Sequence, residues 1–160
     1  MHWKPSADSS GVRIFPPAIF LTALLIGYLL HWVLAIPIVP YSWGIPIRLL
    51  GVAAFLGGIW LIYAATTQFG TVGTSPNPME PTTALTFDGP YRYTRNPMYL
   101  GMALILTGLS FLGNALLPLL MLAPALFVVR TQVIDREERY LEAKFGDEYR
   151  AFKARVRRWF

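Results

Sequence analysis

The feature that most restricts the fold of this chain is a series of apolar runs about as long as a bilayer is thick. The first extends from Pro16 to Ile36 and the second from Ile47 to Ala65, and a helix needs roughly 20 such residues to cross the hydrocarbon core. The third, from Met98 to Val129, is too long for one crossing, and Gly113-Asn114 lies near its middle. We therefore predict an all-α integral membrane fold with four transmembrane helices, the last two forming a helical hairpin. The expected spans are 16–36, 47–65, 98–112 and 115–129.

The composition agrees with a membrane domain. Charged residues make up 14% of the 160 residues, whereas soluble domains contain roughly 25%, so much of the surface must face lipid. The length leaves no room for a separate soluble module, and we expect one membrane domain over residues 1–160. The chain contains no cysteine, and its two histidines, His2 and His31, are far apart. Disulfides, thiolate catalysis and metal centres built on Cys or clustered His are therefore excluded, and no metal is expected.

The net charge of +5 is concentrated in the last part of the chain. Nine of the fourteen Lys and Arg follow residue 129, together with six of the nine acidic residues. Basic residues next to membrane spans are typical of the positive-inside bias and of contact with anionic head groups. We therefore expect the lipid bilayer as a partner and no nucleic acid. The charges from Arg150 to Arg158 are expected to form a solvated face that is attracted to lipid.

Lysine and arginine also predict the orientation of the chain. Four spans place both termini on the same side of the membrane. The loops at 37–46 and 113–114 contain no Lys or Arg and are predicted to lie outside. The loop at 66–97 contains Arg92 and Arg95, so we predict that it is cytoplasmic, together with both termini.

The segment from 66 to 97 is the longest polar stretch, and its four prolines before Tyr91 exclude a regular helix. Loops of this length in small domains are usually functional. After the last span, apolar residues at helical spacing predict amphipathic cytoplasmic helices. Gly146 suits the C-cap of the first and Asp147 the N-cap of the second.

Two features predict how the helices meet. Ala53 and Gly57 have the spacing of small residues that lets helices approach closely. A helical hairpin returns its second end beside its first, so residues 74–99 and 130–142 should come together at the cytoplasmic side. We expect them to form a polar pocket at the membrane surface, open laterally to lipid.

Two motifs resemble the isoprenylcysteine carboxyl methyltransferase and phospholipid methyltransferase family. The first, GPYRYTRNPMYLG, extends from Gly89 to Gly101, and the second begins at Arg136-Glu137-Glu138 and continues to Tyr149. The resemblance covers roughly residues 70–158 and implies that this part binds S-adenosylmethionine without a Rossmann fold. It implies an integral membrane methyltransferase that moves a methyl group to a lipophilic acceptor by in-line displacement and releases S-adenosylhomocysteine.

The resemblance also assigns residues by their positions in the motifs. Catalytic positions fall on Arg95, Asn96 and Glu137, and a substrate-contacting arginine falls near Val133, with Arg130 and Arg136 the nearest candidates. Eukaryotic members carry His where this chain has Asn96, and an amide cannot take a proton near neutral pH, so Asn96 is not a general base. The family's cofactor contacts fall on Thr83, Ala84, Leu85, Thr86, Tyr91, Asn96, Pro97, Met98, Tyr99 and Glu137.

The sequence leaves the acceptor open. A prenylcysteine carboxylate, a phospholipid amine and a small hydrophobic thiol or amine all fit a lipid-borne substrate or lipophilic small molecule. Two other functions stay open as well. One is an NADPH-dependent membrane sterol or lipid reductase, which looks similar in its C-terminal region but has more spans and a longer chain. The other is a non-catalytic membrane subunit.

Overall fold

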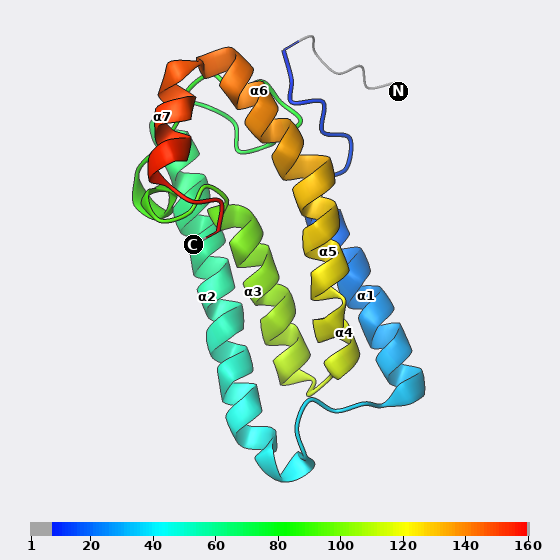
Figure 1. The fold of residues 1–160 in the computed structure, drawn as a ribbon. Helices are drawn as coiled ribbons and strands as arrows, with labels where there is room; N and C mark the ends of the chain where they lie inside the picture. The colour runs from blue at the N-terminus through cyan, green and yellow to red at the C-terminus, as the bar shows by residue number, and fades with distance from the viewer. Residues whose placement is uncertain (1–7, 160) are drawn as a thin grey trace.

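The computed structural model describes residues 8–159, and this part of the chain is helical, with no β-strand. The predicted domain covers residues 1–160, so its residues 1–7 and 160 lie outside the described part of the chain. The prediction that both termini are cytoplasmic also concerns residues outside the described part. The longer helices run side by side, and the last two lie over one end of the bundle (Figure 1). They are α1 (Pro16–Leu34), α2 (Gly44–Thr71), α3 (Pro97–Leu112), α4 (Leu116–Leu120), α5 (Leu122–Val129), α6 (Asp135–Phe145) and α7 (Asp147–Arg155), with short turns η1 (Tyr41–Trp43), η2 (Gly89–Arg92) and η3 (Arg130–Ile134).

Three helical stretches are long and apolar enough to cross a membrane: Pro16–Leu34, Tyr41–Thr71 and Leu116–Phe145. The third is apolar up to Val129, and its remaining residues form the turn η3, which contains Arg130 and Gln132, and the charged helix α6. Helix α3 is apolar but has 16 residues and is shorter than the other three. Each of the four predicted spans falls largely on helix, although the first ends at Leu34 and not at Ile36, and the all-helical prediction is confirmed.

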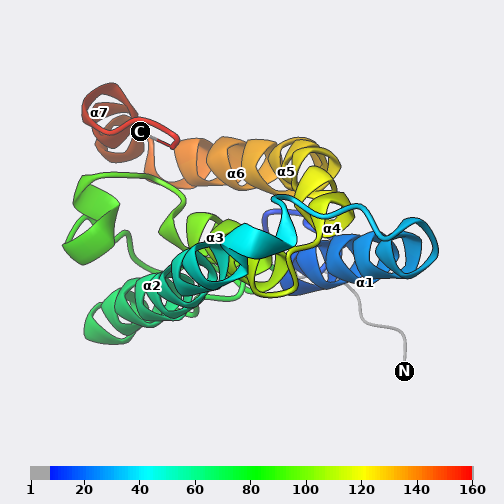
Figure 2. The same cartoon turned by 90° about the horizontal axis from the view of Figure 1, so that it is seen from below.

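Helix α3 occupies the centre of the bundle. It packs against α2 on one side and against α1 and the α4–α5 stretch on the other (Figure 2). The contact with α2 is close because glycines face glycines. A Cβ atom on Gly58 would lie 2.6 Å from the carbonyl oxygen of Gly101, and a Cβ on Gly108 would lie 2.7 Å from that of Gly51. The backbones of α2 and α3 therefore touch at two levels, two helical turns apart.

The predicted small-residue pair Ala53 and Gly57 does not form this contact. Ala53 is exposed, and no atom of a neighbouring helix within residues 8–159 lies within 4 Å of a Cβ built on Gly57. The prediction was wrong because spacing alone does not say which face of an apolar helix meets its neighbour. The face that does so carries Gly51 and Gly58.

The predicted helical hairpin is confirmed, with its turn at Gly113-Asn114. Asn114 adopts a left-handed conformation with φ 47°, which asparagine tolerates better than most residues. Its Oδ1 accepts hydrogen bonds from the backbone N–H groups of Ile38 and Val39, both at 3.1 Å, and its Nδ2 donates to the carbonyl of Val39 at 2.9 Å. One side chain thus ties the hairpin turn to the loop between α1 and α2.

Some predicted boundaries were wrong. Helix α2 continues to Thr71, six residues into the predicted loop, and threonine hydroxyls in this last part donate to carbonyls three or four residues earlier. Gly146, with φ 54°, serves as both the C-cap of α6 and the N-cap of α7, so Asp147 is the first helical residue and not a cap. The span predicted at 115–129 begins at Leu116 and breaks at Met121, where Pro124 offers no N–H to the carbonyl of Leu120.

At one end of the bundle, α6, α7 and the loop from 72 to 96 gather over the start of α3 (Figure 1). The hydroxyl of Tyr99 at the start of α3 donates to Glu137 of α6. The backbone N–H of Thr82 in the loop donates to the hydroxyl of Tyr140 at 3.2 Å. The prediction that the loop and the segment after the last span meet in space is therefore confirmed.

The glycine contact between α2 and α3 gives a matched pair of variants. Gly58→Ala places a Cβ against a backbone oxygen, and overpacking of this kind costs about 1–3 kcal/mol of stability. Gly57→Ala meets open space within the described chain and replaces a poor helix former with a good one. We expect a lower thermal unfolding midpoint in detergent for Gly58→Ala and an unchanged or higher midpoint for Gly57→Ala. Equal midpoints for the two variants would contradict the packing described here.

Candidate functional site

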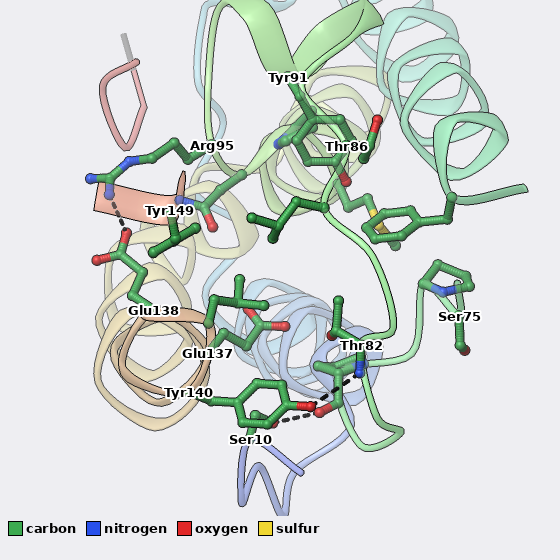
Figure 3. A pocket seen from close by; sticks show the side chains of 18 of the residues that line it. Ser10, Ser75, Thr82, Thr86, Tyr91, Arg95, Glu137, Glu138, Tyr140 and Tyr149 are labelled. Carbon is green, nitrogen blue, oxygen red and sulfur yellow. Dashed lines mark hydrogen bonds and ion pairs between the residues drawn. The ribbon is translucent and has the colours of Figure 1, made fainter. Parts of the chain in front are cut away.

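A pocket lies where the loop, the start of α3, α6 and α7 meet (Figure 3). The empty space among its lining atoms is about 840 Å³, a figure that includes the open mouth of the pocket. The loop contributes residues between Ser75 and Thr86, and α6 contributes residues between Glu137 and Leu141. Arg95 and Glu138 lie at one end, Tyr140, Thr82 and Ser10 at the other, and Glu137 between them (Figure 3).

Most of the predicted site residues line this pocket. All three residues predicted as catalytic do so, and so do nine of the ten predicted to contact the cofactor. Three predicted positions lie elsewhere. The hydroxyl of Thr83 donates to the carbonyl of Gly73, Arg130 is exposed at the end of α5, and Arg136 donates to the carbonyl of Gly11 at 3.2 Å. The predicted residues in the lining are Ala84, Leu85, Thr86, Tyr91, Arg95, Asn96, Pro97, Met98, Tyr99 and Glu137.

Glu137 is the acidic group in the middle of the pocket. Its two carboxylate oxygens lie 2.9 and 2.8 Å from the hydroxyl of Tyr99, which donates to them. Burial raises the pKa of Glu137 from 4.5 to about 7, the hydrogen bond from Tyr99 opposes this rise, and the charge of Glu138 adds to it. Glu137 therefore changes charge near neutral pH and favours the arrival of a cation.

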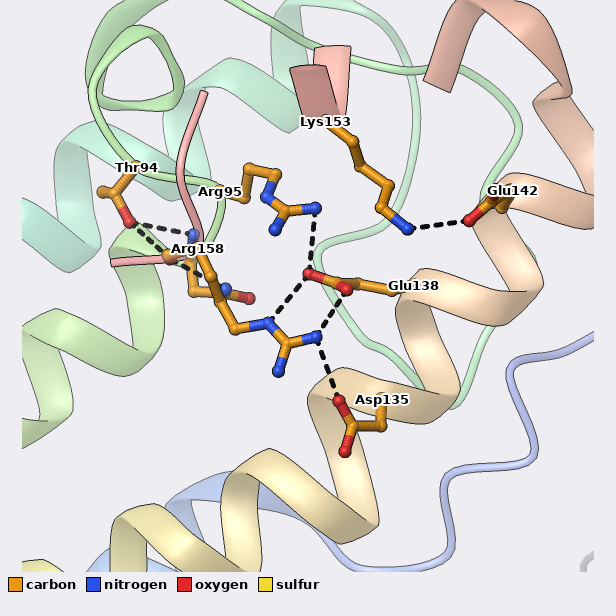
Figure 4. Close-up of polar contacts among 8 residues, drawn as sticks. Thr94, Arg95, Asp135, Glu138, Glu142, Lys153 and Arg158 are labelled. Atoms are coloured by element: carbon orange, nitrogen blue, oxygen red, sulfur yellow. Dashed lines mark hydrogen bonds and ion pairs between the residues drawn. The ribbon is translucent and has the colours of Figure 1, made fainter. Parts of the chain in front are cut away.

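Glu138 points the other way and is held by two arginines (Figure 4). It is 7% exposed, and its Oε1 lies 3.1 Å from Nη1 of Arg95. Arg158 donates to both oxygens of the same carboxylate, from Nε to Oε1 at 3.2 Å and from Nη2 to Oε2 at 2.6 Å. Its Nη2 also lies 3.0 Å from Oδ1 of Asp135. A buried carboxylate with two charge-assisted partners is strongly fixed in position.

The segment after α7 folds back against the first motif. The carbonyl of Arg157 accepts a hydrogen bond from the backbone N–H of Arg95 at 3.1 Å. The carbonyl of Arg158 accepts from the hydroxyl of Thr94 at 2.9 Å and from the side-chain amide of Asn96 at 3.0 Å. The prediction that residues 150–158 form a solvated charged face is therefore wrong for Arg158, whose charge is used inside the protein.

Aromatic side chains surround the end of the pocket near Arg95. Phe69 and Tyr91 meet edge to face at 5.6 Å, and Tyr149 and Phe152 pack beside them in one buried cluster. Burial raises the pKa of the Tyr149 phenol, the charge of Glu138 raises it further, and the charge of Arg95 lowers it. Nε of Arg95 is buried, and no atom of residues 8–159 accepts a hydrogen bond from it.

The segment before α1 closes the opposite end and was not predicted as part of the site. Ser10 donates to the carbonyl of Pro78, and Asp8 accepts from the hydroxyl of Tyr140 at 2.9 Å. Val12 is buried in the main core. No motif in the first 14 residues signals this role, because it depends on where the segment lies in three dimensions.

A second cavity lies on the outer side of the first motif, between α2, η2 and Trp159. Its lining includes the exposed aromatic residues Trp60, Tyr63 and Tyr93. None of the predicted site residues lines it. Across residues 8–159, no group of three or more His, Cys, Asp or Glu side chains could hold a metal ion.

Comparison with known proteins gives one family. The sequence model of the family described as phospholipid methyltransferase matches residues 47–148, more than half of the chain. A protein of Haemophilus influenzae described as an uncharacterized protein is 51% identical over 63 residues, which cover 39% of this chain and 98% of that protein. No solved structure gives a significant match.

The Glu137–Tyr99 pair predicts a titration that infrared spectroscopy can follow. The spectrum of the wild-type protein minus that of Glu137→Gln should show a protonated carboxyl band that disappears as the pH rises through about 7. In Tyr99→Phe the band should persist to higher pH, because the hydrogen bond that favours the carboxylate is lost. Loss of the wild-type band near pH 4.5, the ordinary value, would contradict this environment.

Proposed function

The chain belongs to the phospholipid methyltransferase family, a family of membrane methyltransferases, as its motifs predicted, and on this basis we propose that it transfers a methyl group from S-adenosylmethionine to a lipid-borne acceptor. The observation that carries the proposal is the pocket in which the two motifs meet around Glu137. The family match favours this function over a membrane reductase.

The residues of the pocket fit the methyl donor. The positively charged groups and the ribose hydroxyls of S-adenosylmethionine can bind the carboxylate of Glu137. The carboxylate of S-adenosylmethionine can pair with the guanidinium of Arg95, whose buried Nε has no acceptor among residues 8–159. The adenine matches the apolar side chains of the lining. When bound, the donor supplies a methyl group on a positively charged sulfur.

The role of the chain's own residues is to bind the methyl donor and to orient it toward the acceptor. Glu137 and Arg95 would hold opposite charges of the donor, and residues 84–86 and 96–99 form part of the pocket wall. The side-chain amide of Asn96 is held by the carbonyl of Arg158 and fixes the start of α3. Alignment of donor and acceptor, with water excluded, supplies on the order of 7–11 kcal/mol in well-oriented systems.

We also propose that all four helices cross the membrane as one domain, with the termini and the pocket, formed by residues 70–158, on the cytoplasmic side. Within residues 8–159, Arg48 is the one Lys or Arg near the opposite end of the bundle, and the others gather around the pocket end. Helix α3 has 16 residues and is about 24 Å long. Because the hydrocarbon core is roughly 30 Å thick, an α3 that leaves from the opposite interface would place the pocket floor, where α3 begins, a few Å inside the core.

A phospholipid amine is the acceptor that we propose to test first, because it agrees with the family's description. Prenylcysteine carboxylates and small hydrophobic thiols or amines are the other acceptors to be tested. An amine must lose its proton before it attacks, whereas a carboxylate is already ionised. Arg130, exposed at the pocket end, is retained as a candidate contact for an anionic head group, while Arg136 is engaged by Gly11.

The test uses the purified protein in lipid vesicles with S-adenosylmethionine labelled on its methyl group. We expect label in a phospholipid that carries a free amine, and we expect no thermal stabilisation by NADPH. Stabilisation by NADPH without methyl transfer would replace the proposal with the reductase function. Binding of neither compound would indicate a non-catalytic subunit.

Glu137→Gln should weaken donor binding at least about tenfold above pH 7, because a hydrogen bond to a charged group is worth about 1.5–3 kcal/mol. Glu148→Gln, an exposed position on α7, is the matched control and should bind like the wild-type protein. Protons compete with the cationic donor for Glu137, so wild-type affinity should fall about tenfold per pH unit below about 7. Calorimetry measures both effects, and a wild-type affinity independent of pH would contradict the role of Glu137.

A further inference from the structure

Arg158 is the residue through which the last part of the chain reaches the pocket. It comes after α7 and binds two carboxylates of α6, Glu138 and Asp135, through its side chain. Through its backbone carbonyl it binds Thr94 and Asn96 of the first motif. One residue thus joins three segments that are far apart in the sequence (Figure 4).

The charges of this cluster balance. Glu138 and Asp135 are opposed by Arg95 and Arg158, and both carboxylates lie within 3.0 Å of a guanidinium nitrogen of Arg158. Without Arg158, Arg95 would be the one described cation paired with Glu138, and Asp135 would lose its ion pair. Arg95 would then follow Glu138 wherever that unrestrained carboxylate moved, and its place in the pocket lining would change.

We propose that Arg158 is a positioning residue of the donor pocket, which holds Glu138 on one side and residues 94–96 on the other so that Arg95 and Asn96 keep their places in the wall. This inference rests on the proposed function, since it takes the pocket to be the donor site. Arg158 lies outside the pocket lining, so it acts through Glu138, Arg95 and Asn96.

The segment carries its own matched control. The Arg157 side chain is exposed, and its contribution to the first motif is its backbone carbonyl, which accepts from Arg95. Arg157→Ala therefore removes the same charge one residue away and keeps the hydrogen bond. Val156 and Trp159 pack against the two apolar cores, which keeps the segment attached when the Arg158 side chain is removed.

The experiment measures donor affinity and kcat for the full-length wild-type protein and three variants. Arg158→Ala should raise the Kd for S-adenosylmethionine about tenfold, with a smaller change in kcat at saturating donor, because the pocket wall is displaced. Arg158→Lys should fall between this variant and the wild-type protein, because an ammonium keeps the charge but cannot form both parallel bonds to Glu138. Arg157→Ala should stay within about twofold of the wild-type protein, as surface charges contribute little.

Hydrogen–deuterium exchange of residues 94–96 without donor gives a second readout. Exchange should be several-fold faster in Arg158→Ala than in the wild-type protein and unchanged in Arg157→Ala. Unchanged exchange in Arg158→Ala, or equal losses of affinity in the two alanine variants, would overturn the inference. If the wild-type protein binds no S-adenosylmethionine, the proposed function is wrong. The exchange comparison would still decide whether Arg158 holds residues 94–96 in place.

Discussion

The structure of the pocket depends on one buried carboxylate, Glu138, and on the two arginines that hold it. A buried charge is tolerated when it is paired, and removing one partner of such a pair typically costs about 3–5 kcal/mol. Here Arg95 comes from the first motif and Arg158 from the end of the chain. The pairing orients α6 with Glu138 toward the arginines and Glu137 toward the pocket. The two neighbouring acids therefore have different surroundings and different roles: one fixes the structure and the other faces the pocket.

The packing of the apolar helices brings Arg95 and Glu138 together, although they are far apart in the sequence. The glycine contact fixes α3 against α2, and Asn114 ties the hairpin turn to the loop between α1 and α2 at the opposite end of the bundle. With one end of the hairpin fixed, the start of α3 and the start of α6 meet at the other end. A hydrocarbon core offers no partners for polar groups, so the polar chemistry gathers where the helices leave the apolar region. At this boundary the proposed water-soluble donor would meet the proposed lipid-borne acceptor.

The sequence predicted the helices, the hairpin turn and the meeting of the two motifs because each has a local signal: apolar length, Gly113-Asn114, and patterned residues. It did not predict the glycine face of α2, because an apolar helix surrounded by lipid shows no contrast between its faces. Nor did it predict the π turn at Arg130–Ile134, which inserts an extra residue per turn and changes which residues of α6 face the pocket. Ser10 and Arg158 were missed since their roles arise from tertiary contacts. A charged tail looks the same in sequence whether solvent or Glu138 is its partner.

The most direct test of the account is a structure of the protein with S-adenosylhomocysteine bound. The account predicts that one nucleoside touches both the segment from Tyr91 to Tyr99 and Glu137 of α6, with its amino-acid end near Arg95. A nucleoside bound instead in the outer cavity between Trp60, Tyr93 and Trp159, or in contact with one motif and remote from the other, would contradict it.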